Sequence, residues 1–325
     1  MSTEVHERLT PAPGRRPSSR RPGKTPGGEK PRRGGRQYKG LLFTLPFLLG
    51  FMATYVIPIG YAAYQSLFQQ KASALGFGPT RTVYSGAANF TSVFDDASFW
   101  SSLARVILLG AVQIPVMLGI SLFMALLLDS AAARAVRFFR AGLLIPYVVP
   151  TVVSTLVWLF LYSPTGSPLH DVLQRVGADF DFFGGLTTYL SLGNVLTWQS
   201  IGFNMLLISA ALQSLPREMY EAARLDGASE WRIAWSVKVP NITGILILTG
   251  MFSVIARLQL FGEPLILRQI APESINTDFS PMLTIYYKAF QTGDYNYAAA
   301  QSLILALVTG VIAFFYFRFT NRRAS

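Results

Sequence analysis

The stretch LPREMYEAARLDGASEWRIAWSVKVP, residues 215–240, interrupts a chain that is otherwise strongly hydrophobic. Between positions 217 and 238 it carries four basic and four acidic residues, so its net charge is zero. The runs on either side, residues 182–216 and 239–256, contain no Asp, Glu, Lys, Arg or His. Whether these two runs cross a membrane decides how the charged stretch between them is interpreted.

The composition of the chain is typical of a membrane protein. Of its 325 residues, 51% are hydrophobic and only 14% are charged, whereas a soluble domain carries about 25% charged residues. The absence of cysteine excludes disulfides, thiolate metal sites and cysteine nucleophiles. With only two histidines, His6 and His170, we also expect no metal site.

Long uncharged segments mark the expected membrane spans. A charge in the middle of a helix in hydrocarbon costs about 2.5–3.5 kcal/mol, and a span needs about 18 or more apolar residues. The sequence has six uncharged gaps of that length, so we expect an all-α integral membrane protein with six transmembrane helices. Small residues in the spans should allow close helix contact, namely Ala111, Gly119, Gly202, Ser209, Ala210 and Ala211. Prolines inside or near the apolar runs each tend to kink a helix, and these are Pro46, Pro58, Pro115, Pro146 and Pro150. The spans are expected at about residues 41–68, 104–128, 141–162, 188–213, 241–267 and 296–317.

Basic residues predict the orientation of the chain. If the N-terminus is cytoplasmic, 21 of the 28 Lys and Arg residues fall in cytoplasmic segments, as the positive-inside rule requires. Both termini are then cytoplasmic, residues 40–320 form the transmembrane domain, and residues 214–240 form a cytoplasmic loop, here called the charged loop.

The first 39 residues differ in character from the rest of the chain. Residues 1–39 are basic and rich in Pro and Gly, so they cannot build a core and we expect them to be disordered. Beside a membrane span, such a tail acts as a topology signal and can contact anionic membrane lipid. We expect no nucleic-acid binding, because no aromatic platform accompanies the charge.

The charged loop is predicted to contain two short helices joined at a glycine. Pro216 suits the first turn of a helix, and Asp226-Gly227 is a turn signal. Ser229 is positioned to cap a second helix over residues 228–239. Such a compact, charge-balanced elbow is more than a topology signal requires, and we expect it to fit against another surface.

The same residues resemble the EAA motif of permease subunits of bacterial ABC importers, in the maltose- and glycerol-phosphate-type carbohydrate group. In that family the loop is a coupling helix that sits in a groove of the ATPase, and the fold is the type I ABC importer permease fold. This chain departs from the pattern at Ala234, Val237 and Val239. The resemblance implies that ATPase coupling falls to Glu221, Ala222, Ala223, Asp226 and Gly227.

The resemblance also implies the partners and the location. It predicts a multi-pass protein of the bacterial plasma membrane that pairs with a second, homologous permease, an ABC ATPase dimer and an extracytoplasmic solute-binding protein or lipoprotein. Gly23-Lys24-Thr25 imitates the end of a P-loop, but Ser18 stands where the motif needs glycine. We therefore expect no catalytic residue and no cofactor in this chain, with ATP and Mg bound by the partner ATPase.

Polar residues in the spans are candidates for the substrate path. Asn194, Trp198 and Asn204 fall on one face of a helix, and amide and indole groups together suit a sugar. Gln259 and Glu263 are four residues apart and would share a face, although Pro264 predicts a broken helix there. The alternatives are hydrogen bonds between helices for the first group and a salt bridge to the second permease for the other pair.

Two other functions remain open at this stage. The cargo of a related importer could be glycerol phosphate or a polyol, although Arg257 is the one basic candidate for the path, which favours a neutral di- or oligosaccharide. An ion-driven secondary transporter would be expected to show repeated halves and a mid-membrane ion site. The sequence has no convincing half-repeat.

Overall fold

The computed structural model describes residues 37–71, 81–130, 135–178 and 180–321. Most of the basic tail, the P-loop-like Gly23-Lys24-Thr25 and Ser18 lie outside these residues. The contacts divide the chain into two compact units, Met1–Tyr55 and Val56–Ser325. In the first unit, helix α1 (Gln37–Phe51) leads into a π-helix, η1 (Met52–Val56), and Phe47, Phe51 and Tyr55 stack along it.

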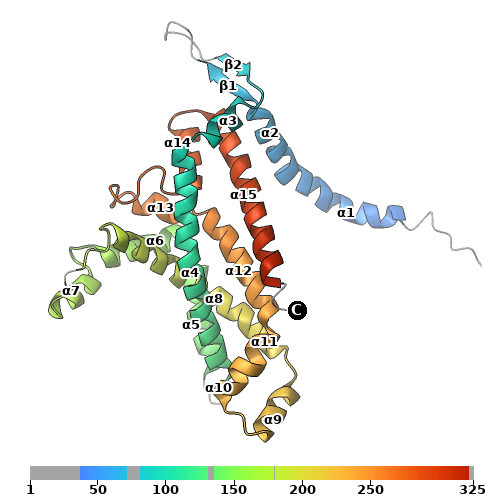
Figure 1. Ribbon diagram of the computed structural model, residues 1–325, viewed down its shortest axis with the longest axis vertical. Helices are drawn as coiled ribbons and strands as arrows, with labels where there is room; N and C mark the ends of the chain where they lie inside the picture. The colour runs from blue at the N-terminus through green and yellow to red at the C-terminus, as the bar shows by residue number, and fades with distance from the viewer. Residues whose placement is uncertain (1–36, 72–80, 131–134, 179, 322–325) are drawn as a thin grey trace, which may run out of the picture. The chain divides into compact units, whose positions relative to one another are not determined.

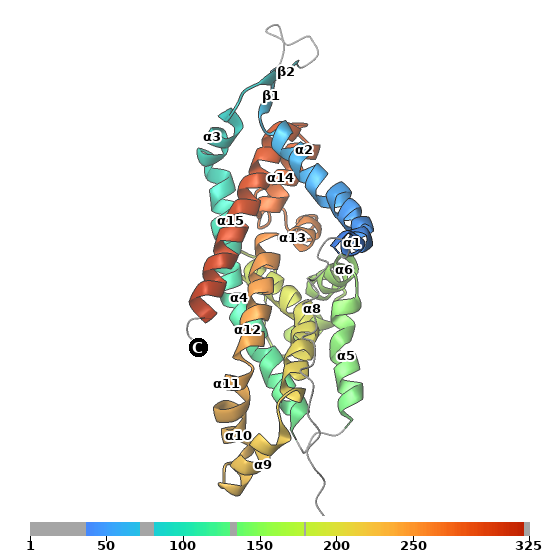
Figure 2. The same cartoon turned by 90° about the vertical axis from the view of Figure 1, so that its right-hand side faces the viewer.

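Five helical segments of the described chain are long and apolar enough to cross a membrane. The first, Leu42–Gln65, runs from α1 through η1 into α2 (Ile57–Gln65). In the second unit, α4 packs along α8, and α12 packs against both α4 and α15 (Figures 1 and 2). The bounds of these helices are α4 Ala97–Asp129, α8 Leu186–Gln213, α12 Thr243–Leu258 with α13 Gly262–Leu267, and α15 Tyr295–Asn321.

The third expected span, residues 141–162, is not one straight helix. It consists of α5 (Val136–Val148) and α6 (Thr151–Tyr162), which meet at an angle of 96°. Pro150 has no backbone N–H to continue α5, and its ring pushes Val149 into an extended conformation with φ −69° and ψ 129°. Counting this pair as one span gives six.

Short elements connect the long helices. One is an antiparallel hairpin of β1 (Phe68–Lys71) and β2 (Arg81–Tyr84), in which Phe68 pairs with Tyr84. The sequence predicts helices only and does not indicate this hairpin, because strands of four residues are too short to give a clear alternating pattern. The remaining short helices are α3 Ala88–Phe94, α7 Pro168–Arg175 and α14 Pro281–Phe290.

Close helix contact is visible where α8 meets α5. A side chain at Gly202 would collide with the backbone carbonyl of Leu143 and the Cα atom of Leu144. The glycine therefore lets the two backbones approach each other, as small residues do in membrane helices. This contact agrees with the role that the sequence predicts for Gly202.

Candidate coupling loop and substrate path

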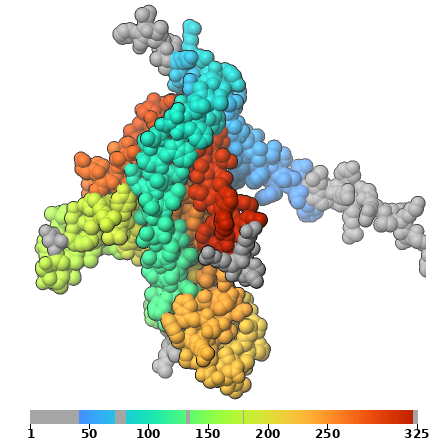
Figure 3. Space-filling view, in the orientation of Figure 1, coloured from blue at the N-terminus to red at the C-terminus, as the bar shows by residue number. Residues whose placement is uncertain are grey.

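The charged loop forms its own cluster of short helices at one end of the second unit. Figure 3 shows it as a lobe beyond the end of α4. The chain leaves α8, forms an elbow of α9 and α10, and passes through a π-helix into α12. The bounds are α9 Arg217–Leu225, α10 Glu230–Ile233, η2 Ala234–Lys238 and α11 Val239–Asn241.

The elbow turns at Gly227, as the sequence predicts. Gly227 has a φ of +78°, in the left-handed region that favours glycine. Its N–H donates to the carbonyl of Arg224 at 3.0 Å, and Ala228 N–H donates to Ala223 at 3.0 Å, a pattern that closes the C-terminal end of α9. Ser229 then caps α10 by accepting a hydrogen bond from the N–H of Arg232 at 3.3 Å.

The outer surface of the elbow is open. Glu221, Ala222, Asp226 and Gly227 are exposed, and Ala223 is half-buried. The five residues predicted for ATPase coupling thus lie close together in sequence and at the surface. Their binding to an ATPase stays a prediction.

The surface of this lobe carries an ion pair and two exposed apolar side chains. Arg224 pairs with Glu230 at 2.8 Å across the elbow, and this carboxylate raises the pKa of the Arg224 guanidinium above its usual value. The side chains of Leu225 and Trp231 are 89% and 67% exposed. Large apolar side chains at the tip of a protruding lobe are typical of an interaction surface.

A second set of contacts holds the lobe against the helical bundle. Lys238 Nζ lies 2.6 Å from Oδ2 of Asp129, the last residue of α4, and 5.0 Å from the centre of the Tyr220 ring. The Tyr220 hydroxyl donates to the carbonyl of Leu212 in α8 at 3.3 Å. Burial, and then the negative charge of Asp129, raise the pKa of Tyr220. No local sequence pattern indicates this cluster, because Asp129 lies 109 residues away from Lys238 in the sequence.

Two of the predicted path residues face α6. Asn194 donates a 2.8 Å hydrogen bond from Nδ2 to the hydroxyl of Tyr162, and the rings of Trp198 and Trp158 meet edge to face at 5.8 Å. Asn204 is buried and donates to the carbonyl of Ser200 in its own helix at 2.9 Å. The structure therefore joins Asn194 and Trp198 in one aromatic cluster and places Asn204 in a different environment.

Gln199 lies on the α6 side of α8 as well. Its Nε2 donates to the hydroxyl of Ser154 in α6 at 2.6 Å. On a helical wheel Gln199 falls on the opposite side from Asn194, Trp198 and Asn204. Its position one residue after Trp198 lets it reach α6 beside the aromatic cluster.

The pair Gln259 and Glu263 does not share the face of one helix. α12 ends at Leu258, Gln259 is exposed, and Phe261 departs from helical geometry with φ −138° and ψ −57° before α13 begins. Glu263 is buried, with 8% of its surface exposed. The predicted break near Pro264 is present, and it separates these two side chains.

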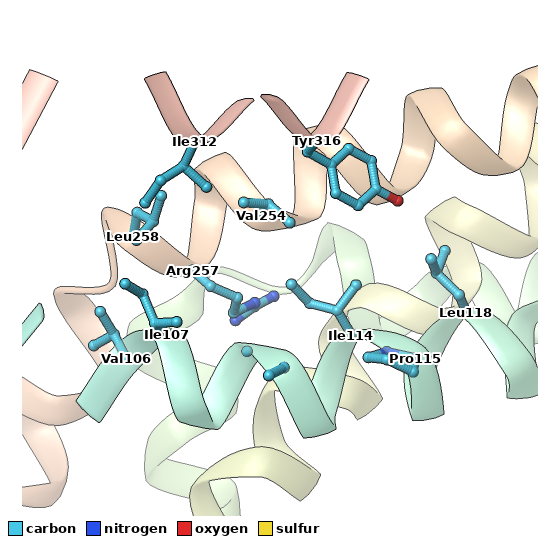
Figure 4. A pocket seen from close by; sticks show the side chains of 12 residues that line it. Val106, Ile107, Ile114, Pro115, Leu118, Val254, Arg257, Leu258, Ile312 and Tyr316 are labelled. Carbon is cyan, nitrogen blue, oxygen red and sulfur yellow. The ribbon is translucent and has the colours of Figure 1, made fainter. Parts of the chain in front are cut away.

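Arg257 is a buried cation near the end of α12, with 8% of its surface exposed. Its guanidinium Nη2 donates to the hydroxyl of Ser200 at 3.1 Å, and its stem lines a cavity of about 440 Å³ whose other walls are almost entirely apolar (Figure 4). The cavity lies between α4, α12 and α15, and Ile114, Val254 and Tyr316 contribute to it. Within the described residues no ion pair joins Arg257 to Glu263.

The fold agrees with what comparison with known proteins finds. Residues 117–325 match the family described as binding-protein-dependent transport system inner membrane component. The chain belongs to this family and is therefore a permease subunit of a transport system in the inner membrane. It has the fold of an ABC importer permease.

Individual relatives align over most of the chain. The diacetylchitobiose uptake system permease protein NgcF of Streptomyces coelicolor is 30% identical, covering 91% of this chain and 87% of that protein. The sn-glycerol-3-phosphate transport system permease protein UgpA of Agrobacterium fabrum is 29% identical, with 87% and 94% covered. A chain in the crystal structure of a bacterial alginate ABC transporter, in complex with an alginate pentasaccharide-bound periplasmic protein, matches with a TM-score of 0.75 at 18% identity, with 89% and 96% covered.

Proposed function

We propose that this chain is a permease subunit of an ATP-driven importer of a sugar, with a di- or oligosaccharide as the favoured cargo. The observation that carries this proposal is the 30% identity to a diacetylchitobiose permease over 91% of the chain. The cluster on α8 and α6 supports it, because Asn194, Tyr162 and Trp198 offer amide, hydroxyl and aromatic groups at one place. Such groups hydrogen-bond to sugar hydroxyls and stack on the C–H face of a sugar ring.

The charged loop supplies the proposed link to ATP hydrolysis. In this mechanism Glu221, Ala222, Ala223, Asp226 and Gly227 enter a groove of a separate ABC ATPase, which binds ATP and Mg²⁺. Both termini lie in the cytoplasm, on the same side as the loop. When ATP closes the ATPase dimer, the loop moves with it and the bundle tilts between inward-facing and outward-facing states. In this mechanism the chain binds the ATPase and the sugar and changes conformation, and its residues catalyse no covalent reaction.

The assembly needs three kinds of partner. A second, homologous permease completes the path, two ATPase chains drive it, and an extracytoplasmic solute-binding protein delivers the sugar. The exposed Leu225 and Trp231 on the loop support a protein partner at that end. We further propose that Glu263 and Gln259, on either side of the helix break, contribute to the path within this assembly.

The experiment is uptake in proteoliposomes that contain the complete complex. The binding protein is first screened by thermal shift against lactose, N,N′-diacetylchitobiose, maltotriose, glycerol and sn-glycerol-3-phosphate. Uptake of the labelled compound that stabilises it is then measured with ATP inside the vesicles and no ion gradient. ATP-dependent accumulation of a sugar supports the proposal. Accumulation driven by an ion gradient without ATP would instead assign the chain to ion-driven transport.

A glycerol-phosphate or polyol cargo is the second candidate. The observation that favours it is the 29% identity to UgpA over 87% of the chain. In that case sn-glycerol-3-phosphate or glycerol would stabilise the binding protein and the sugars would not. Replacement of Arg257 by Gln would then raise the half-saturating concentration of the phosphate ester more than that of glycerol, because a phosphate interacts with a guanidinium through charge.

A further inference from the structure

A buried ion pair fastens the charged loop to the end of α4. The side chains of Lys238 and Asp129 are 7% and 16% exposed, and their charged atoms lie 2.6 Å apart. In the other ion pair of the described residues, Arg224 and Glu230 are 45% and 54% exposed. An exposed pair contributes little, whereas loss of one member of a buried pair leaves an uncompensated charge. Lys238 and Asp129 therefore constrain the loop more strongly than the pair at its tip does.

The position of Asp129 in its helix supports a specific role for the contact. Asp129 is the last residue of α4, where the unpaired carbonyl groups form the negative end of the helix dipole. A carboxylate is unfavourable at that end of a helix. Lys238 offsets this cost only while the loop stays docked, so the charge of Asp129 ties the end of α4 to the position of the loop.

Lys238 is held in place by two further elements. It is the last residue of the π-helix η2, and a π-turn inserts an extra residue that changes which side chains face the bundle. Its ammonium also lies over the ring of Tyr220 in α9, a cation–π contact. The ammonium of η2 thus contacts α4 and α9 directly, and α8 is joined to it through the hydrogen bond from Tyr220 to Leu212.

We propose that Lys238, Asp129 and Tyr220 form a joint through which movement of the charged loop is transmitted to α4. They are positioning residues for transport and contact neither the ATPase nor the cargo. α4 has 33 residues and so extends about 50 Å from this joint at 1.5 Å per residue. The inference rests on the proposed function, because it needs a separate ATPase to move the loop.

The absence of cysteine allows a direct test in the full complex. Ser101→Cys places one thiol at an exposed position in the part of α4 that is far in sequence from Asp129, on a chain with no other cysteine. The rate at which a membrane-impermeant maleimide labels this chain is measured with and without Mg-ATP and vanadate. Attachment of the ATPase is followed by co-purification and its activity by phosphate release.

Lys238→Met should leave the ATPase attached and active. The ATP-dependent change in the rate of maleimide labelling at position 101 should fall about tenfold, which is within the usual range for coupling between two sites. The exchange Lys238→Asp with Asp129→Lys should restore much of the change, because it rebuilds the pair with the opposite polarity. Lys288→Met is the matched control, since Lys288 also lies over a tyrosine ring, 5.7 Å from the centre of Tyr297, but in α14. It should behave as the parent protein does.

In an assembled complex, any one of three results would overturn the proposed joint. These are an unchanged response in Lys238→Met, an exchange variant no better than the single variant, or no ATP-dependent change at position 101 in a complex that accumulates sugar. If Lys238→Met does not assemble, the near-isosteric Asp129→Asn takes its place, and failure of both to assemble would make the pair a folding element and end the proposal. Failure of the proposed function is distinct, because the parent complex would then show no ATP-dependent uptake at all.

Discussion

The hydroxyl of Tyr297 donates a 2.8 Å hydrogen bond to Oδ2 of Asp96, the residue that caps α4. The other carboxylate oxygen of Asp96 accepts the N–H groups of Ser98 and Phe99 at 3.0 and 3.2 Å. One carboxylate thus satisfies the first turn of α4 and joins it to the start of α15. The carboxylate of Asp96 therefore connects two long helices of the second unit, α4 and α15, at this end.

Loss of this carboxylate should destabilise the protein. We expect Asp96→Ala to cost about 0.5–2 kcal/mol, the range for removing an N-cap, and to lower the melting temperature in detergent. Tyr297→Phe removes one hydrogen bond and should cost about 1 kcal/mol. Asp95→Ala is the matched control, because the adjacent Asp95 is exposed. An equal loss in the control would contradict the capping role.

Gly202 should tolerate no side chain. Gly202→Val would place a Cβ atom into the backbone of Leu143, and overpacking of this kind costs about 1–3 kcal/mol or more. We expect a sharp fall in the yield of folded protein, measured by size-exclusion chromatography with fluorescence detection. Gly119→Ala, where a Cβ would meet nothing within 4 Å, should fold normally. A stable Gly202→Val protein would show that α5 and α8 are not in close contact.

Replacement of Gly227 should act on coupling. A side chain in the left-handed conformation costs about 1–2 kcal/mol, and nothing within 4 Å would obstruct a Cβ atom there, so the strain is in the backbone alone. Gly227→Val should lower sugar uptake and co-purification of the ATPase together. Gly227→Asn should retain more of both, because asparagine adopts positive φ more readily. Equal behaviour of the two variants would argue against the turn as the reason for the glycine.

Glu263 should matter for uptake. It is buried and has no ion pair within the described residues, and buried ionisable groups in membrane helices usually serve a path or a partner. We expect Glu263→Gln to reduce ATP-dependent uptake several-fold with the complex assembled. Glu273→Gln, at an exposed position, is the control. Normal uptake by the assembled Glu263→Gln complex would remove Glu263 from the path.

The sequence alone predicts the helical membrane fold and the elbow of the charged loop, because both depend on local signals. Uncharged runs mark the long helices, and Gly227 and Ser229 mark a turn and a cap. The bend at Pro150 was expected only as a kink, since a proline shows where a helix can break but not the angle that tertiary packing selects. The ion pair of Lys238 with Asp129 joins positions that are 109 residues apart, and no local pattern connects them.

For the candidate path residues, the sequence does not predict which neighbouring helix each side chain contacts. A helical wheel places Asn194, Trp198 and Asn204 on one face, but it contains no neighbouring helix. In the structure, Tyr162 and Trp158 of α6 contact Asn194 and Trp198. The amide of Asn204 instead donates a hydrogen bond to a backbone carbonyl of its own helix. Similarly, the four-residue spacing of Gln259 and Glu263 implies a shared face only for a continuous helix, and this one ends at Leu258.

The corner between α5 and α6 has a consequence for what surrounds the protein. At Pro150 the regular ladder of backbone hydrogen bonds stops, and this residue is exposed on the chain. Hydrocarbon tails cannot satisfy the carbonyl groups that such a corner releases, so irregular backbone at that depth exists only beside protein or water. The 96° turn therefore marks a sector of the permease from which lipid is excluded, to be filled by a neighbouring subunit or by an aqueous vestibule.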